Sequence, residues 1–301
     1  MRLDDQRESS NIDDERGADT SGIGGAGGGF GGGRMRIGGI GAIAVVLVGM
    51  YFGIDPRLIL GLLDGSGGSV QTQQSQAPHP QQTAQEDSQR RFVAKVLGST
   101  EDVWTQQFQA MGRTYHPPHL VLFTDVIQSG CGVAQSATGP FYCPADGRVY
   151  LDTAFFQELQ GRLGAGGDFA RAYVIAHEIG HHVQDELGLM QRTDELRQRL
   201  DERGRNALSV RVELQADCYA GVWAKQADDA KHILETGDVE QGITAAAAVG
   251  DDRLQRMSRG TVSPDSFTHG SSAQRVAWFK RGFAGGAIGA CDTFARNADV
   301  E

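Results

Sequence analysis

Apolar residues recur at helical spacing through the second half of the chain, and two stretches are apolar almost all round. Residues 168–187 and 209–223 are these stretches, and each predicts a largely buried helix. Two short runs rich in β-branched and aromatic residues, 119–125 and 147–152, predict strands. Further helices are expected at residues 91–112, 192–206, 238–258 and 271–284. The pattern therefore predicts an α+β domain that is mainly helical with a small sheet.

The first 89 residues follow a different pattern. Residues 1–36 are polar and then rich in glycine, which predicts a disordered tail. Residues 37–54 (IGGIGAIAVVLVGMYFGI) carry no charge and predict a single transmembrane helix, near the short limit for crossing a bilayer. Residues 55–89, rich in Gly, Ser, Gln and Pro, predict a flexible linker. The folded domain is then expected at residues 90–295.

Charges around the apolar segment predict its orientation. Arg34 and Arg36 precede it and Arg57 alone follows it, which favours a cytoplasmic N-terminus. The folded domain would then lie outside the cytoplasm, held at the inner membrane by a single-pass anchor. A buried helix of a soluble protein or a cleaved signal peptide fits the flanking polar segments less well. The net charge of −10, without a basic stripe, argues against nucleic acid as a partner.

The first of the two buried helices contains the pentapeptide His177-Glu178-Ile179-Gly180-His181. Residues four apart lie on one helix face, so the two imidazoles can bind one metal ion. Glu178 can reach the open side of that ion and accept a proton from a water molecule there. Surface histidines on an amphipathic helix are the alternative. Buried imidazole and carboxylate groups need a partner, however, and a single zinc ion would serve all three.

A hydrolytic zinc site needs a third protein ligand, and the second buried helix offers two candidates. Glu213 and Asp217 lie four residues apart on an otherwise apolar helix. We expect Glu213 to bind the metal, and Asp217 to accept a hydrogen bond from the outer ring nitrogen of a ligand histidine. Exchanged roles for the two acids, or an exposed acidic pair without a metal, are the alternatives.

Four cysteines agree with a domain outside the cytoplasm. Cys131 and Cys143 bracket a short loop that a disulfide would close, and Cys218 could meet Cys291. The sequence alone does not determine the pairing. For Cys218 a small buried thiol is the alternative, and this side chain points away from the face that carries the proposed ligands.

These motifs resemble those of the gluzincin group of metallopeptidases, in which Glu-x-x-x-Asp follows His-Glu-x-x-His some thirty residues later. The chain resembles one bacterial family, the neutral zinc metallopeptidases, more closely. The matching stretches are residues 129–152, 174–188, 208–224 and 269–279. The resemblance covers roughly residues 90–291 and implies a zincin-like, membrane-tethered peptidase with one zinc ion.

The resemblance also implies roles outside the two motifs. The strand at 148–152 would be the sheet edge that pairs with an extended peptide substrate, unless it is only a core strand. His269 would donate a hydrogen bond to the oxyanion of the reaction, and Arg275 would brace either Glu213 or Asp217. A structural role for His269 is the alternative, in which case Tyr173 or Tyr219 could donate that hydrogen bond.

The sequence therefore predicts zinc-dependent hydrolysis of a peptide or protein substrate. His177, His181 and Glu213 would bind the metal and Glu178 would act as general base. Two other functions remain open: an inactive zinc-stabilised scaffold or assembly factor of the envelope, and a zinc amidase acting on a cell-wall component. A structural zinc needs no Glu178 and usually has four protein ligands, which disfavours the scaffold.

Overall fold

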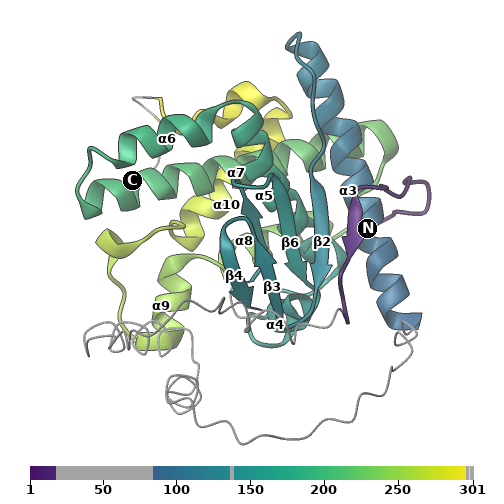
Figure 1. Ribbon diagram of the computed structural model, residues 1–301, viewed down its shortest axis with the longest axis horizontal. Helices are drawn as coiled ribbons and strands as arrows, with labels where there is room; N and C mark the ends of the chain where they lie inside the picture. The colour runs from purple at the N-terminus through teal and green to yellow at the C-terminus, as the bar shows by residue number, and fades with distance from the viewer. Residues whose placement is uncertain (18–83, 136–138, 296–297, 299–301) are drawn as a thin grey trace, which may run out of the picture. The chain divides into compact units, whose positions relative to one another are not determined.

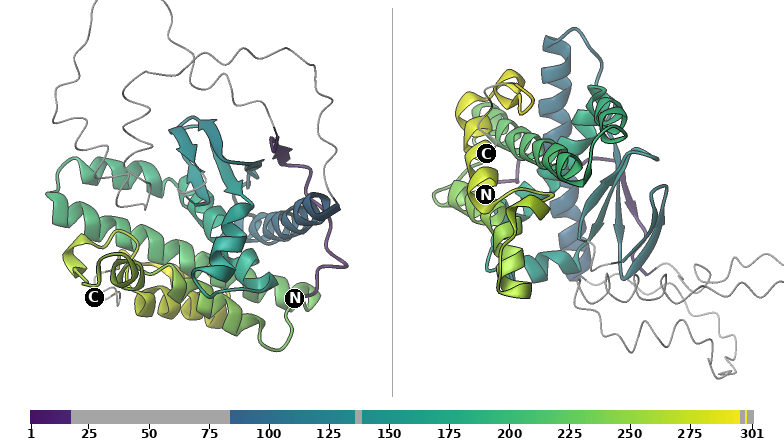
Figure 2. Two further views of the ribbon diagram at one scale, coloured as in Figure 1. Left: turned by 90° about the horizontal axis from the view of Figure 1, so that it is seen from below. Right: turned by 90° about the vertical axis from the view of Figure 1, so that its left-hand side faces the viewer.

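The computed structural model describes residues 1–17, 84–135, 139–295 and 298 (Figure 1). These residues belong to one compact unit that joins Met1–Ala18 to Gln82–Glu301. Within it the fold is α+β, mainly helical with small sheets, as the apolar pattern predicts. The helices gather on one side of the larger sheet, which Figure 2 shows in its right-hand view.

Four strands form the larger sheet, in the order β1 (Ile12–Asp14), β2 (His119–Phe123), β6 (Arg148–Asp152) and β5 (Phe141–Cys143). The first three are parallel, and β5 runs antiparallel to β6. The strands predicted at 119–125 and 147–152 are therefore confirmed as β2 and β6. A separate antiparallel hairpin pairs β3 (Val126–Ser129) with β4 (Gly132–Gln135).

Both central strands are apolar at almost every position because both of their faces are covered. Leu122 and Leu151 face the helices and belong to the main core. Val121 and Tyr150 face the other way, where they pack with Ile127 of the β3–β4 hairpin. A disulfide between Cys131 and Cys143 joins that hairpin to β5.

The helical layer is built around α5 (Asp168–Glu186) and α7 (Glu202–Lys231), which contain the two predicted buried helices. α8 (Asp238–Ala248) packs against α5, and α10 (Ser272–Gly285) packs along α7. The other α-helices of the described residues are α3 (Ala84–Ala110), α4 (Ala154–Gly161), α6 (Leu189–Arg197) and α9 (Asp251–Arg259).

Glycines allow these helices to approach closely. A Cβ at Gly180 of α5 would lie 3.0 Å from the carbonyl oxygen of Ala216 on α7. A Cβ at Gly282 of α10 would lie 1.9 Å from the carbonyl oxygen of Cys218, also on α7. Because side chains are missing at these positions, the backbones of α5 and α10 can both lie against α7. A second disulfide, Cys218–Cys291, holds the segment after α10 to α7.

Three expectations from the sequence are wrong in detail. The strand at 148–152 is not a sheet edge, because β6 pairs on one side with β2 and on the other with β5. The helix expected at 238–258 is interrupted between α8 and α9, where Asp251 and Asp252 bind the loop that precedes α10. The linker expected at 55–89 ends earlier, because α3 begins at Ala84.

The predicted disordered tail is also wrong for its first half. Residues 1–17 lie against the domain, and β1 extends the parallel sheet beyond β2. The folded unit therefore includes these residues as well as the segment that follows residue 83. The predicted membrane segment, residues 37–54, lies outside the described residues. Among the helices that the structure describes, none has the length and apolar character needed to span a bilayer.

Candidate active site

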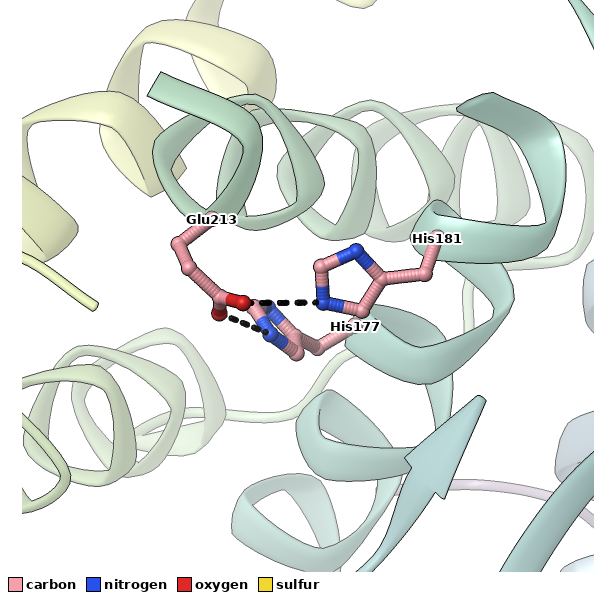
Figure 3. Close-up of side chains that lie close together, drawn as sticks. All are labelled: His177, His181 and Glu213. Carbon is pink, nitrogen blue, oxygen red and sulfur yellow. Dashed lines mark hydrogen bonds and ion pairs between the residues drawn. The ribbon is translucent and has the colours of Figure 1, made fainter. Parts of the chain in front are cut away.

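His177, His181 and Glu213 converge at the crossing of α5 and α7 (Figure 3). One nitrogen or oxygen from each residue lies within 4.8 Å of the others. Nε2 of His177 is 3.2 Å from Oε2 of Glu213, and Nε2 of His181 is 3.5 Å from Oε1 of the same carboxylate. The prediction that these three side chains meet is confirmed.

These separations bring both imidazoles close enough to the carboxylate for one metal ion to bind all three side chains. For bonds of about 2.0–2.2 Å to zinc, two tetrahedral corners lie about 3.3–3.6 Å apart, similar to the two distances from the imidazoles to the oxygens of Glu213. The donor set of two imidazoles and one carboxylate is a common one for catalytic zinc, and it leaves a fourth position open. Among the described residues this is the one cluster of three or more potential metal ligands.

Asp217 supports the first ligand histidine. Its Oδ1 accepts a hydrogen bond from Nδ1 of His177 at 2.9 Å, which directs Nε2 of that ring toward Glu213. This is the arrangement that the spacing of Glu213 and Asp217 predicts. Burial alone would raise the pKa of Asp217, but Arg275 and His177 outweigh burial and lower it.

Arg275 is buried beside this carboxylate and pairs with it through two nitrogens. Nε donates to Oδ2 of Asp217 at 2.8 Å and Nη2 donates to Oδ1 at 2.9 Å. The hydroxyl of Tyr173 donates to Oδ1 as well. Asp217 is fully buried and Arg275 is 3% exposed, so this ion pair lies within the core. Of the two acids that the sequence left open for Arg275, it pairs with Asp217.

Gln184 supports His181, the second candidate ligand, and sequence reasoning missed it. Its Oε1 accepts a hydrogen bond from Nδ1 of His181 at 2.9 Å, which leaves Nε2 of that ring for a metal. The Gln184 amide nitrogen donates to the carbonyl of Val212 at 2.7 Å and to Gln215 at 3.1 Å, which fixes the orientation of the amide. The available signal was position: Gln184 lies three residues after His181, where side chains of a helix meet.

Glu178 follows the first ligand on α5 and is 8% exposed. Burial raises the pKa of its carboxyl, while His177 and His181 act in the opposite direction. For Glu213 the balance is reversed: burial would raise its pKa, but His181 and His177 lower it well below the usual value. The two carboxylates of the site therefore differ in proton affinity, with the higher affinity at Glu178.

His269 lies in the loop before α10, and its ring interacts electrostatically with Glu213. Burial opposes its protonation, but Asp251 and Glu213 outweigh burial and raise its pKa, so the ring is within electrostatic reach of the ligand carboxylate. Nδ1 of His269 is 3.2 Å from Oδ1 of Asp251. Oδ2 of Asp251 accepts the backbone N–H groups of Thr268 and His269, each at 2.7 Å, and that of Gly270 at 3.1 Å.

The two tyrosines considered as alternatives to His269 lie elsewhere. Tyr173 is buried and its hydroxyl donates a hydrogen bond to Asp217, so it helps to hold the carboxylate that orients His177. Tyr219 is buried against Trp104, with the rings at a centroid distance of 5.5 Å. Asp251, which orients the histidine loop, was not predicted because it falls inside the helix that the sequence indicated at 238–258.

Comparison with known proteins identifies the family. The model of the family described as "Putative neutral zinc metallopeptidase" matches residues 1–294, and the chain belongs to this family. It is 47% identical to "Uncharacterized protein YpfJ" of Escherichia coli (strain K12) over 301 residues, 99% of this chain and 100% of the relative. It is 41% identical to "Uncharacterized protein Rv2575" of Mycobacterium tuberculosis over 262 residues, 82% of this chain and 85% of the relative. No solved structure matches.

Proposed function

We propose that this member of the neutral zinc metallopeptidase family hydrolyses peptide bonds with one zinc ion held by His177, His181 and Glu213. The observation that carries the proposal is that the three side chains bring one donor atom each within 4.8 Å of the others, with both imidazoles 3.2 and 3.5 Å from an oxygen of the Glu213 carboxylate. The buried carboxylate of Glu178 beside them is the feature that a purely structural zinc site does not require.

Zinc in this position would polarise the carbonyl of the substrate and lower the pKa of an attacking water molecule. Glu178 would accept the proton of that water and later donate it to the departing amine. A raised pKa suits both steps, because the carboxylate must bind the proton and then release it. Glu213, whose pKa is lowered, stays ionised and suits the role of ligand.

His269 is our candidate for stabilising the oxyanion. The Asp251 carboxylate holds Nδ1 of the ring and the backbone on both sides of it. With Nδ1 donating to Asp251, Nε2 carries a proton and can donate toward a substrate oxygen only when the ring is protonated, which the raised pKa of His269 favours. A donor whose position is set before the reaction stabilises developing charge without reorganisation. Asp251 is the positioning residue in this scheme.

An extended substrate needs a sheet edge, and β5 provides one next to α5. The described residues pair β5 with β6 on one side, and β5 packs against α5. Tyr142 of β5 donates a hydrogen bond at 2.7 Å to Asp185 near the end of α5. We therefore propose β5, rather than β6, as the strand along which a peptide would bind by backbone pairing.

Hydrolysis of a casein or peptide-library substrate by the purified full-length chain tests this proposal. We expect turnover that a chelator abolishes and added zinc restores. Glu178→Gln should keep one zinc per chain but lose about 10²–10⁴-fold in kcat. Full turnover by Glu178→Gln would remove Glu178 as the base. A zinc-loaded chain without activity on any peptide would instead favour a scaffold or an amidase.

A further inference from the structure

Residues 1–17 form an integral part of the catalytic domain. β1 lies beside β2 (Figure 1). The two strands are parallel, with Ile12 opposite Leu120 and Asp14 opposite Leu122. Ladder bonds continue past the strand, where the backbone nitrogen of Glu15 donates to the carbonyl of Leu122 at 2.8 Å. Ile12 is 7% exposed and belongs to the main core. The segment thus completes the sheet on the side opposite β5.

A buried carboxylate on α3 depends on this segment. Glu101 is 3% exposed. It accepts hydrogen bonds from Ser9 Oγ at 2.5 Å and Asn11 Nδ2 at 2.8 Å, and Arg7 Nη2 lies 2.6 Å from its other oxygen. All of these partners come from residues 1–17. Without them Glu101 would lose the groups that compensate its charge, which is costly at a buried position.

The surface of α3 is also shaped to receive this segment. Ser9 donates its backbone N–H to the carbonyl of Ala94 at 2.9 Å. Gly98, in the middle of α3, faces the same stretch. A Cβ there would lie 2.5 Å from the carbonyl oxygen of Arg7 and 3.3 Å from the nitrogen of Ser9. A glycine in a helix interior weakens the helix, and here its absent side chain is what lets the segment lie against α3.

Contacts extend to both ends of the segment. The backbone N–H of Arg2 donates to the carbonyl of Ile233 at 2.8 Å, and its guanidinium donates to the carbonyl of His232 at 2.6 Å. At the other end the guanidinium of Arg16 donates to Asp14 at 2.6 Å and to the carbonyl of Glu86 at 3.1 Å. Residues 1–17 are therefore bound to the loop after α7, to α3 and to β2.

We propose that residues 1–17 and the catalytic domain lie on the same side of the membrane, so that residues 37–54 do not carry the chain across it. A strand cannot pair with a sheet across the roughly 30 Å of a hydrocarbon core. Whatever path joins residue 17 to residue 84 must cross a bilayer an even number of times or not at all. A single crossing, as the charge flanks of the sequence favour, would pull β1 out of the sheet.

Two crossings would need more apolar sequence than the chain offers. Each spanning helix takes about 20 predominantly apolar residues, and a pair takes about 40. The uncharged stretch is residues 37–54, and Asp55 and Arg57 follow it directly.

Labelling of one introduced cysteine at a time, in the full-length chain in cells, tests the proposal. Glu8→Cys lies in the N-terminal segment and Gln109→Cys lies on α3, and both positions are exposed. The four native cysteines form the two disulfides, and the wild type measures any background. A membrane-impermeant maleimide would be applied to spheroplasts before and after permeabilisation.

We expect both cysteines to label under the same condition, either both before or both after permeabilisation. Labelling of one position before and of the other only after permeabilisation would overturn the proposal. Neither result depends on peptidase activity, so the experiment is independent of the proposed function.

A stability measurement on the purified chain tests the packing of residues 1–17, because the Tm should change in opposite directions with and without it. Gly98→Ala should lower the Tm, because the added Cβ would meet the carbonyl of Arg7. If residues 1–17 do not lie on α3, the same change should raise the Tm through better helix propensity. Gly161→Ala on α4, where nothing lies within 4 Å of an added Cβ, is the matched control and should leave the Tm unchanged or higher. A rise with Gly98→Ala would contradict the proposal.

Discussion

The two histidines that we propose as metal ligands are supported by different chemistry, although they lie one turn apart on the same helix. His177 donates to the fully buried carboxylate of Asp217, which also accepts hydrogen bonds from Arg275 and Tyr173. His181 donates to a neutral amide, Gln184, which a backbone carbonyl and a second amide orient. The first support contains opposite charges at buried positions, while the second contains no charged group. The difference teaches that one ligand depends on an ion pair and the other on hydrogen-bond geometry alone.

Loss of the Asp217 carboxylate should reduce stability and zinc affinity more than loss of any other supporting group. Asp217→Asn removes the negative charge, keeps only one of the two acceptor oxygens that serve His177 and Arg275, and leaves Arg275 buried without its counter-charge. Breaking a buried ion pair in this way costs about 3–5 kcal/mol, and losing a carboxylate behind a metal-bound histidine weakens metal binding by about 10–100-fold. Urea denaturation of the metal-free protein and a zinc competition titration would measure the two effects.

A surface acid on the same helix provides the control for this change. Asp229 pairs with Lys225 four residues earlier, and its side chain is 53% exposed. Asp229→Asn should therefore change stability by less than about 1 kcal/mol and leave zinc affinity unchanged. If Asp217→Asn changed stability and zinc affinity as little as Asp229→Asn, the charged support of His177 would contribute to neither.

Loss of the Gln184 amide that supports His181 should reduce zinc affinity less than loss of the Asp217 carboxylate. Gln184→Leu keeps the volume at a fully buried position but removes the acceptor for Nδ1 of His181. We expect zinc affinity to fall by about tenfold, at the lower end of what such supporting groups contribute. Gln191→Leu on the exposed face of α6 is the matched control. A larger loss from Gln184→Leu than from Asp217→Asn would reverse the ranking of the two supports.

His269 extends the comparison to a histidine that has a charged support but is not a proposed ligand. Asp251→Asn should lower kcat by about tenfold, because the ring loses its fixed orientation. Zinc content should stay at the wild-type value, since no donor to the metal is touched. Zinc loss in this variant would mean that Asp251 serves the metal site itself. The pH profile of kcat would separate positioning of the ring from general destabilisation.

The charged support also predicts a pH effect in the metal-free protein. Burial disfavours protonation of His177, but Asp217 and Glu213 outweigh it and raise its pKa from 6.5 to about 9. A group with a raised folded-state pKa stabilises the fold fully below its unfolded value and loses that contribution as pH rises through the folded value. The stability that His177 provides should therefore fall between pH 6.5 and about 9.

Urea denaturation of the metal-free wild type and of His177→Gln over this range isolates the contribution of the ring. The stability difference between the two proteins should shrink as pH rises. A difference that grows with pH would contradict the raised pKa.

Much of the site could be predicted because it rests on local spacing. His177 and His181 share a face through helix geometry alone, and the acidic pair on α7 follows the same rule. Gln184 was missed because an amide three residues from a ligand has many other uses. Asp251 was missed because its partners, Thr268 to Gly270, follow it by almost twenty residues and meet it only in the folded chain.

The fold was less predictable where pairing is long-range. β2 and β6 are apolar on both faces and were recognised, but β1 reads Ile-Asp-Asp and carries no strand pattern. Its place in the sheet depends on partners far along the chain: Ile12 pairs with Leu120, and the neighbouring residues Ser9 and Asn11 bind Glu101 on α3, 92 and 90 residues away. The polar composition of this segment predicted disorder. The prediction was wrong because another part of the chain supplies the surface that the segment needs in order to fold.

Zinc content is the measurement that tests the central claim most directly. Full-length wild type, dialysed against trace zinc, should contain one ion per chain, and Glu213→Ala should contain a small fraction of that amount. Glu202→Ala, an exposed acid at the start of the same helix, should match the wild type. One full equivalent of zinc in Glu213→Ala, held as tightly as in the wild type, would contradict the proposed ligand set.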